Sequence, residues 1–130
     1  MKSLLLVDDR PNDLRIAASA AGELGITEVK AETSVMSARR YLENGLEGGG
    51  PLPDGIVLDL DLGYESGFEL LRFWHSNPRL FAIPILVWSV MDREQEICEL
   101  FKVTSFVSKW KGPKAFREAL AQLAASRTQV

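Results

Sequence analysis

Residues 55–63 read GIVLDLDLG, a short apolar run that ends in two aspartates, Asp59 and Asp61. The run is apolar on consecutive residues, as expected for a parallel strand that helices cover on both faces. Unpaired charge is costly to bury, so a buried strand that ends in carboxylates brings them to a particular site. We therefore interpret the stretch as a central strand of an α/β sheet, with Asp59 at its functional end.

Other short runs rich in Leu, Ile and Val predict four further strands. The segments between the runs carry apolar residues at helical spacing, as in the stripe of Phe116, Leu120 and Leu123. Strands and helices thus alternate, and right-handed crossovers leave few topologies for such a chain. We predict an α/β fold, a doubly wound five-stranded parallel sheet in the order 2-1-3-4-5 with five helices. The other strands are predicted at 3–7, 28–31, 84–88 and 105–107.

The composition limits the organisation and the partners of the chain. With 130 residues, of which 46% are hydrophobic, we expect one domain over residues 1–130 and no output domain. The 18 acidic and 15 basic residues are interspersed and give a net charge of −3, which argues against direct DNA binding and against anionic membranes. Cys98 is the only cysteine, and no signal peptide or membrane span is recognisable. We predict a cytoplasmic protein.

Polar residues stand where four of the predicted strands end. The first strand ends at Asp8 and Asp9, the third at Asp59, the fourth at Ser89 and the fifth at Lys109. In doubly wound sheets the functional crevice lies beyond the carboxyl ends of the strands, at the switch between the first and third. We therefore expect these five residues to meet at one edge of the sheet.

The expected group of residues has the chemistry of phosphoryl transfer. Three carboxylates, from Asp8, Asp9 and Asp59, need a cation, and oxygen ligands without His or Cys favour Mg²⁺ or Mn²⁺. Lys109 supplies a positive charge and Ser89 a hydroxyl donor. A carboxylate nucleophile together with these groups can stabilise a phosphoryl group in transfer. The expected product is an aspartyl phosphate on Asp59.

With these residues in place, the chain resembles the receiver domain of two-component response regulators over nearly its whole length. The segment PDGIVLDLDLGYESG is similar to the family's segment around its phosphoacceptor. The resemblance implies the CheY-like form of the flavodoxin-like fold. It also implies a role for each matching residue: Asp59 as phosphoacceptor, Asp8 and Asp9 as Mg²⁺ ligands with the backbone carbonyl of Asp61, Ser89 and Phe106 as switch residues, and Lys109 as the lysine that contacts the phosphoryl group.

Several positions beside the predicted site depart from the family pattern. Gly63 stands where the family usually has proline, and Val90 stands where a small residue is usual. Val90, Met91 and Trp110 are expected to flank the site. Trp110 replaces the proline that commonly follows the lysine, usually in cis. A cis bond without proline costs about 2.5–4 kcal/mol, so the peptide bond from Lys109 to Trp110 is expected to be trans or strained.

The resemblance also implies how the protein signals. A phosphohistidine on a sensor histidine kinase or a histidine phosphotransfer protein would supply the phosphoryl group to Asp59. The resulting conformational change would be passed to a downstream protein target, by relay or through a homodimer. Such a stand-alone receiver is not an enzyme for other substrates, because it catalyses only its own phosphorylation and dephosphorylation.

Other interpretations of the same residues remain open at this point. Asp8 and Asp9 are also suited to cap a helix whose first turn contains Pro11, and Lys109 alone reads as a surface lysine. The motif LDLDLG also resembles the signature of haloacid-dehalogenase-like phosphatases, small enzymes in which the second aspartate, here Asp61, acts as acid and base. The third hypothesis is a receiver-like module that binds partners without being phosphorylated.

Overall fold

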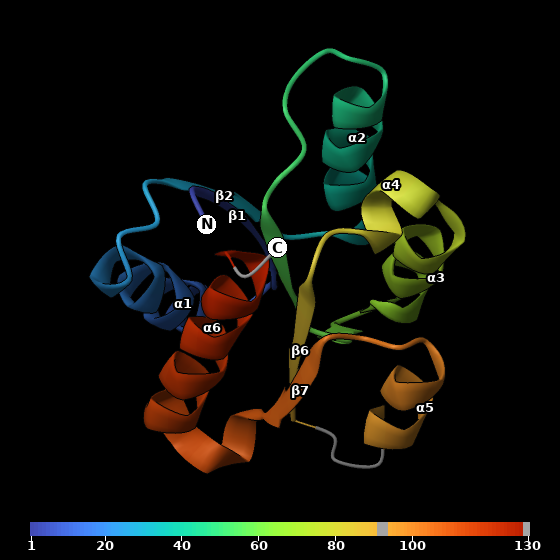
Figure 1. The fold of residues 1–130 in the computed structure, drawn as a ribbon. Coiled ribbons are helices and arrows are strands. Elements are labelled where there is room, and N and C mark those ends of the chain that lie inside the picture. Colours follow the sequence, from blue (N-terminus) through green and yellow to red (C-terminus); the bar gives the residue numbers. More distant parts are fainter. Residues whose placement is uncertain (91–93, 129–130) are drawn as a thin grey trace.

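Five parallel strands form the central sheet of the computed structural model, in the order β2-β1-β3-β6-β7 (Figure 1). The structure describes residues 1–90 and 94–128, with side chains up to residue 125. Counted within the sheet, this is the predicted order 2-1-3-4-5, and the prediction is confirmed. The strands are β1 (Ser3–Val7), β2 (Glu28–Glu32), β3 (Gly55–Leu58), β6 (Ile85–Ser89) and β7 (Ser105–Ser108).

Helices cover both faces of the sheet, with α1 and α6 on one side and α2, α3, α4 and α5 on the other (Figure 1). Their bounds are α1 Pro11–Glu23, α2 Val35–Leu46, α3 Phe68–Ser76, α4 Pro78–Phe81, α5 Gln95–Leu100 and α6 Gly112–Thr128. No helix within residues 1–90 or 94–128 combines the length and the hydrophobicity that crossing a membrane requires.

The helix α4 is an addition to the five helices that the sequence predicts. It is a single turn that begins where Asn77 ends α3, and its proline occupies the first helical position. The side-chain oxygen of Asn77 accepts hydrogen bonds from the backbone N–H groups of Arg79 and Leu80, at 2.9 and 3.3 Å. This cap starts a new helical turn after the break, in a segment for which the sequence analysis predicts no helix.

Alternate residues of each central strand enter two separate parts of the core. Leu5 and Val7 of β1 pack with residues of α2 and α3, whereas Leu4 and Leu6 pack with residues of α1 and α6. All four side chains are at most 1% exposed. Burial on both faces explains why the strand sequences are apolar without alternation, since successive side chains point to opposite sides.

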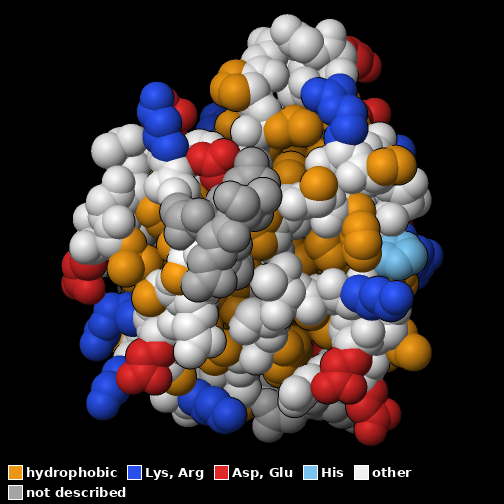
Figure 2. Space-filling view, viewed as in Figure 1, with side chains coloured by type: hydrophobic (Ala, Val, Ile, Leu, Met, Phe, Trp, Pro, Cys, Tyr) orange, Lys and Arg blue, Asp and Glu red, His pale blue; other side chains and the backbone are white. Residues whose placement is uncertain are grey.

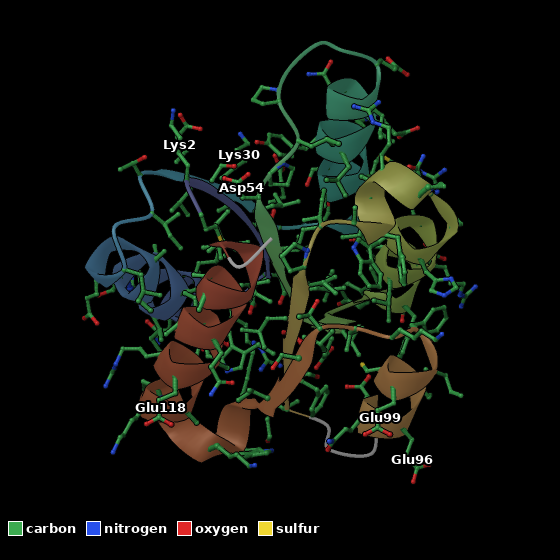
Figure 3. All side chains as sticks on the ribbon, in the orientation of Figure 1. Lys2, Lys30, Asp54, Glu96, Glu99 and Glu118 are labelled. Atoms are coloured by element: carbon green, nitrogen blue, oxygen red, sulfur yellow. The ribbon has the colours of Figure 1, made fainter. Side chains whose placement is uncertain are left out.

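At the amino edge of the sheet, the side chain of Asp54 binds the start of β1, a contact that no sequence motif indicates. The carboxylate of Asp54 accepts hydrogen bonds from the backbone N–H groups of Lys2 and Ser3, at 2.8 and 3.1 Å. In Figure 3 Asp54 and Lys2 lie at the end of the sheet opposite to the turn that leads into α6. The functional residues predicted from the sequence lie at the opposite edge, where the strands have their carboxyl ends.

Charged side chains of both signs are distributed over the surface. Figure 2 shows Lys and Arg interspersed with Asp and Glu around the visible face. The labelled Glu96 and Glu99 of α5 and Glu118 of α6 are exposed on the outer sides of their helices (Figure 3). The mixed charges on this face agree with the small net charge of the chain.

Candidate functional site

Lys109 brings the acidic residues of three chain segments together at the carboxyl edge of the sheet. It begins the short 3-10 turn η2 (Lys109–Lys111) that follows β7. Its Nζ atom donates hydrogen bonds to Oδ2 of Asp8 at 2.7 Å, of Asp13 at 2.7 Å and of Asp59 at 2.9 Å. The side chain of Lys109 is only 7% exposed. The predicted convergence of Asp8, Asp59 and Lys109 is therefore observed, and Asp13 is a member that the sequence reasoning missed.

Asp59 is held at the end of β3 by both its backbone and its side chain. Its N–H donates to the carbonyl of Val7 at 2.9 Å, and its Oδ1 accepts from the N–H of Asp61 at 3.0 Å. Burial raises the pKa of this carboxyl from 3.8 to about 6, although the hydrogen bonds from Lys109 and Asp61 act in the opposite direction. The hydrogen bonds to ionised Asp59 therefore do not fully offset the cost of burying its charge. Carboxyl groups with a shifted pKa of this kind are common at sites that bind a cation or a reaction partner.

Three carboxylates at this edge are close enough to share one cation. One oxygen each of Asp8, Asp9 and Asp59 lies within 4.8 Å of the others. Asp8 and Asp59 are buried and Asp9 is exposed, so the group is open to solvent on one side. Burial raises the pKa of Asp8, with Lys109 opposing it. Hard oxygen ligands, surplus negative charge and an open side fit Mg²⁺ or Mn²⁺. The carbonyl of Asp61 as a further ligand stays a prediction.

A two-stranded hairpin follows Asp59, formed by β4 (Asp61–Leu62) and β5 (Glu65–Ser66). Gly63 opens its two-residue turn with φ of +71°. Proline is locked near −65° and cannot adopt this angle, which explains the departure from the family pattern at this position. Glycine in the first turn position is the arrangement expected of a two-residue hairpin loop.

The glycine that closes the motif, Gly67, has a steric role beside the site. A Cβ atom on this residue would lie 2.5 Å from the carbonyl oxygen of Asp59 and 2.8 Å from Cα of Leu60. Its N–H donates to the carbonyl of Leu60 at 2.9 Å. Any larger residue would therefore displace the backbone that carries Asp59.

Ser89 is at the predicted place, but its hydroxyl has a partner that was not expected. It lies at the end of β6, paired in register with Ser108, the residue before Lys109. Its Oγ donates to Oε1 of Glu94 at 2.7 Å. Phe106 is half-buried and packs against the core on the side of α3 and α5. The switch roles of Ser89 and Phe106 stay predictions.

Trp110 connects the loops that follow β6 and β7. Its indole N–H donates to the carbonyl of Val90 at 2.9 Å, and its backbone N–H donates to Oγ of Ser108 at 3.2 Å. The side chain is nevertheless 79% exposed. No cis peptide bond occurs in the described part of the chain, so the bond from Lys109 to Trp110 is trans. Met91, the other predicted flanking residue, lies outside the described residues.

The sequence reasoning missed Asp13, Glu94 and Arg10. Arg10 forms an ion pair with the side chain of Asp61 at 3.3 Å, on the exposed side of the site. The residues predicted for the site stand at strand ends, whereas Asp13 lies in the first turn of α1, four residues after Asp9. Because Asp9 precedes the helix, the spacing of the two residues gives no signal in the sequence that would have identified Asp13. Glu94 lies five residues after Ser89 along the chain.

Comparisons with solved structures place the fold in a known family. The phosphorylated cyanobacterial phytochrome response regulator RcpA is 30% identical, with a TM-score of 0.77 over 91% of this chain and 87% of that protein. The Mn²⁺-bound response regulator Rcp1 is 25% identical, with a TM-score of 0.73 over 92% of this chain and 88% of Rcp1. The chain therefore belongs to the response regulator receiver family, as the resemblance implied.

A curated sequence relative agrees with this membership. The chemotaxis protein CheV1 of Helicobacter pylori is 27% identical over 126 residues, which are 92% of this chain and 37% of CheV1. The chain thus spans about a third of the length of that relative. No protein-family model matches the sequence.

Proposed function

We propose that the protein acts as a response regulator that accepts a phosphoryl group on Asp59. The observation that carries the proposal is the convergence of Asp8, Asp9 and Asp59 on one side and Lys109 on the other, at the carboxyl edge of a receiver fold. The phosphoryl source is a phosphohistidine on a sensor kinase or phosphotransfer protein. We place the reaction in the cytoplasm, the location that the sequence predicts.

The proposed reaction forms one bond and breaks one bond. A lone pair on a carboxylate oxygen of Asp59 forms the new bond to phosphorus. The bond from phosphorus to the donor nitrogen breaks, and the departing imidazole retains that electron pair and takes up a proton from solvent. Asp59 is suited to this role because hydrogen bonds orient both of its carboxylate oxygens. The N–H of Asp61 donates to Oδ1, and Lys109 donates to Oδ2.

A divalent cation would be held by Asp8, Asp9 and Asp59, with the carbonyl of Asp61 as the proposed fourth protein ligand. When bound, it would neutralise charge on the carboxylates and on phosphoryl oxygens. Lys109 would orient the phosphoryl group through its N–H donors. The hydroxyl of Ser89 would leave Glu94 and donate to the phosphoryl group instead. Both changes would alter the contacts at the carboxyl ends of β6 and β7, which we propose as the source of the signal to a protein target or to a second copy of the chain.

The test of the proposal is incubation with acetyl phosphate and Mg²⁺, followed by intact mass measurement. We expect one added phosphoryl group, which is lost in Asp59→Asn and kept in Asp61→Asn. Absence of labelling in the unaltered protein would favour the phosphorylation-independent module. Label retained in Asp59→Asn would mean that another residue is the acceptor.

Two observations argue against the phosphatase hypothesis. Its signature belongs on the first strand of the enzymes that carry it, whereas LDLDLG here follows the third strand along the chain, β3. The side chain of Asp61, which would have to act as acid and base, is paired with Arg10. Turnover of a small phosphomonoester with Mg²⁺ would be the result that restores this hypothesis.

A further inference from the structure

The ammonium group of Lys109 has used all of its hydrogen-bond donors. A lysine ammonium has three N–H donors, and the carboxylates of Asp8, Asp13 and Asp59 accept one each. The bond to Asp13, at 2.7 Å, is as short as the bond to Asp8. Distances of this size are typical of charge-assisted hydrogen bonds, which are the strong ones. Asp13 is therefore a full partner of Lys109.

Asp13 differs from the other two acceptors in its relation to the candidate cation site. Asp8 and Asp59 belong to the group of carboxylates within 4.8 Å of one another, together with Asp9, whereas Asp13 is not a member of that group. It reaches Lys109 from the first turn of α1, which packs on the sheet, and its side chain is only 20% exposed. A cation would compete with Lys109 for Asp8 and Asp59, but it would leave Asp13 available.

The other side of the ammonium group is bounded by an aromatic ring. Nζ of Lys109 lies 4.9 Å from the ring centre of Trp88, and Trp88 packs on Phe116 with ring centres 4.2 Å apart. The ring attracts the cation, but it accepts no strong hydrogen bond in exchange for a carboxylate. Asp13 is thus the contact that can fix the direction of Nζ once the cation has engaged the other two carboxylates.

We propose that Asp13 is a positioning residue, which holds the ammonium group of Lys109 at the site while a cation and a phosphoryl group occupy Asp8, Asp9 and Asp59. This inference rests on the proposed function. When Asp59 forms its bond to phosphorus, the carboxylate loses its full charge, and the donor that Lys109 gave to it turns to a phosphoryl oxygen. The bond to Asp13 remains and keeps the lysine in place for that contact.

The first experiment measures phosphorylation by acetyl phosphate at saturating Mg²⁺ in Asp13→Asn. Glu23→Gln is the matched control, because Glu23 is an exposed carboxylate at the other end of the same helix. We expect the maximal rate to fall about tenfold in Asp13→Asn, the size of one charge-assisted hydrogen bond, and to be unchanged in the control. Asp13→Glu, which restores the charge, is expected to recover part of the rate.

The second experiment is independent of phosphorylation. In ¹⁵N-correlated NMR spectra of the Mg²⁺-bound protein, the side-chain NH₃⁺ signal of Lys109, assigned by its absence in Lys109→Arg, is expected to be protected from exchange. Protection is expected to persist in Glu23→Gln and to be lost in Asp13→Asn, with backbone signals intact. Asp13→Ser takes the place of Asp13→Asn if the latter disturbs the helix start.

The results separate the failure of this inference from the failure of the proposed function. Labelling of Asp59 at an unchanged rate in Asp13→Asn, with the Lys109 signal retained, overturns the role of Asp13 and leaves the function standing. A loss of Mg²⁺ affinity in Asp13→Asn as large as in Asp9→Ala also overturns it, because Asp13 would then be a cation ligand. If the unaltered protein is not labelled, the proposed function fails, and the NMR comparison alone decides whether Asp13 positions Lys109.

Discussion

Replacing Asp59 by Asn should stabilise the cation-free protein at neutral pH. The carboxyl is 1% exposed, and its burial raises the pKa from 3.8 to about 6. A tenfold change in acidity is about 1.4 kcal/mol, so the ionised side chain costs the folded state about 3 kcal/mol at pH 7. Asn has the shape of the neutral acid and does not carry this cost. We expect Asp59→Asn to raise the free energy of unfolding by up to about 3 kcal/mol.

The pH dependence follows from the direction of the pKa shift. Above pH 6 Asp59 is ionised in both the folded and the unfolded chain, and the full cost is present. Between pH 6 and 3.8 the folded protein binds more protons than the unfolded chain, so the cost falls as the pH falls. Near pH 3.8 and below, the difference between the two proteins should disappear.

Urea denaturation of both proteins between pH 4 and pH 8, with and without Mg²⁺, measures this effect. Mg²⁺ should stabilise the unaltered protein and reduce the advantage of Asp59→Asn, because the cation compensates the charge that the substitution removes. The reasoning is refuted if Asp59→Asn is the less stable protein at pH 7 without Mg²⁺. It is also refuted if a stabilisation of full size persists at pH 4.

Three further substitutions test neighbouring parts of the site. Gly67→Ala should lower the free energy of unfolding by about 1–3 kcal/mol in urea denaturation, since its Cβ would meet the Asp59 carbonyl at 2.5 Å, whereas Gly22→Ala, with nothing within 4 Å, should not destabilise. Equal effects would contradict the steric role. Glu94→Gln should speed labelling by acetyl phosphate about fivefold, because the Ser89 hydroxyl exchanges a charged acceptor for a neutral one; slower labelling would mean that Glu94 assists the reaction. Lys109→Ala should keep Mg²⁺ binding in calorimetry but weaken the response to phosphorylation, and a loss of affinity like that of Asp9→Ala would contradict its role.

The order of the strands and the position of the site could be predicted because both depend on burial. Strands covered on both faces must be apolar throughout, so β1, β3 and β6 are recognisable, and carboxylates at their ends are conspicuous. The prediction was also accurate for β2, although its side chains are largely exposed, because the five-unit pattern required a strand there. These parts of the structure follow from the pattern of the whole chain.

The remaining contacts depend on side-chain directions that the sequence pattern does not determine. Asp13 reads as an ordinary acid in a first helical turn, where it complements the helix dipole, and only the fold shows that it reaches Lys109. The Ser89 hydroxyl was expected at the phosphoryl group, but a short hydrogen bond directs it to Glu94. The turn at Gly63 depends on one positive φ angle, and the missing proline was the only sign of it.

The charges of the site explain why cation binding, lysine position and phosphorylation should depend on one another. Burial by itself would lower the pKa of Lys109, but hydrogen bonds to Asp13, Asp8 and Asp59 outweigh this effect and raise it. Burial raises the pKa of Asp8 and of Asp59, and the hydrogen bonds from the same ammonium group do not fully offset this effect. A divalent cation would relieve that imbalance, and in doing so it would weaken two of the three bonds that hold Lys109. In the role proposed for Asp13, the third bond would keep Lys109 at the site and allow the cation and the lysine to act together.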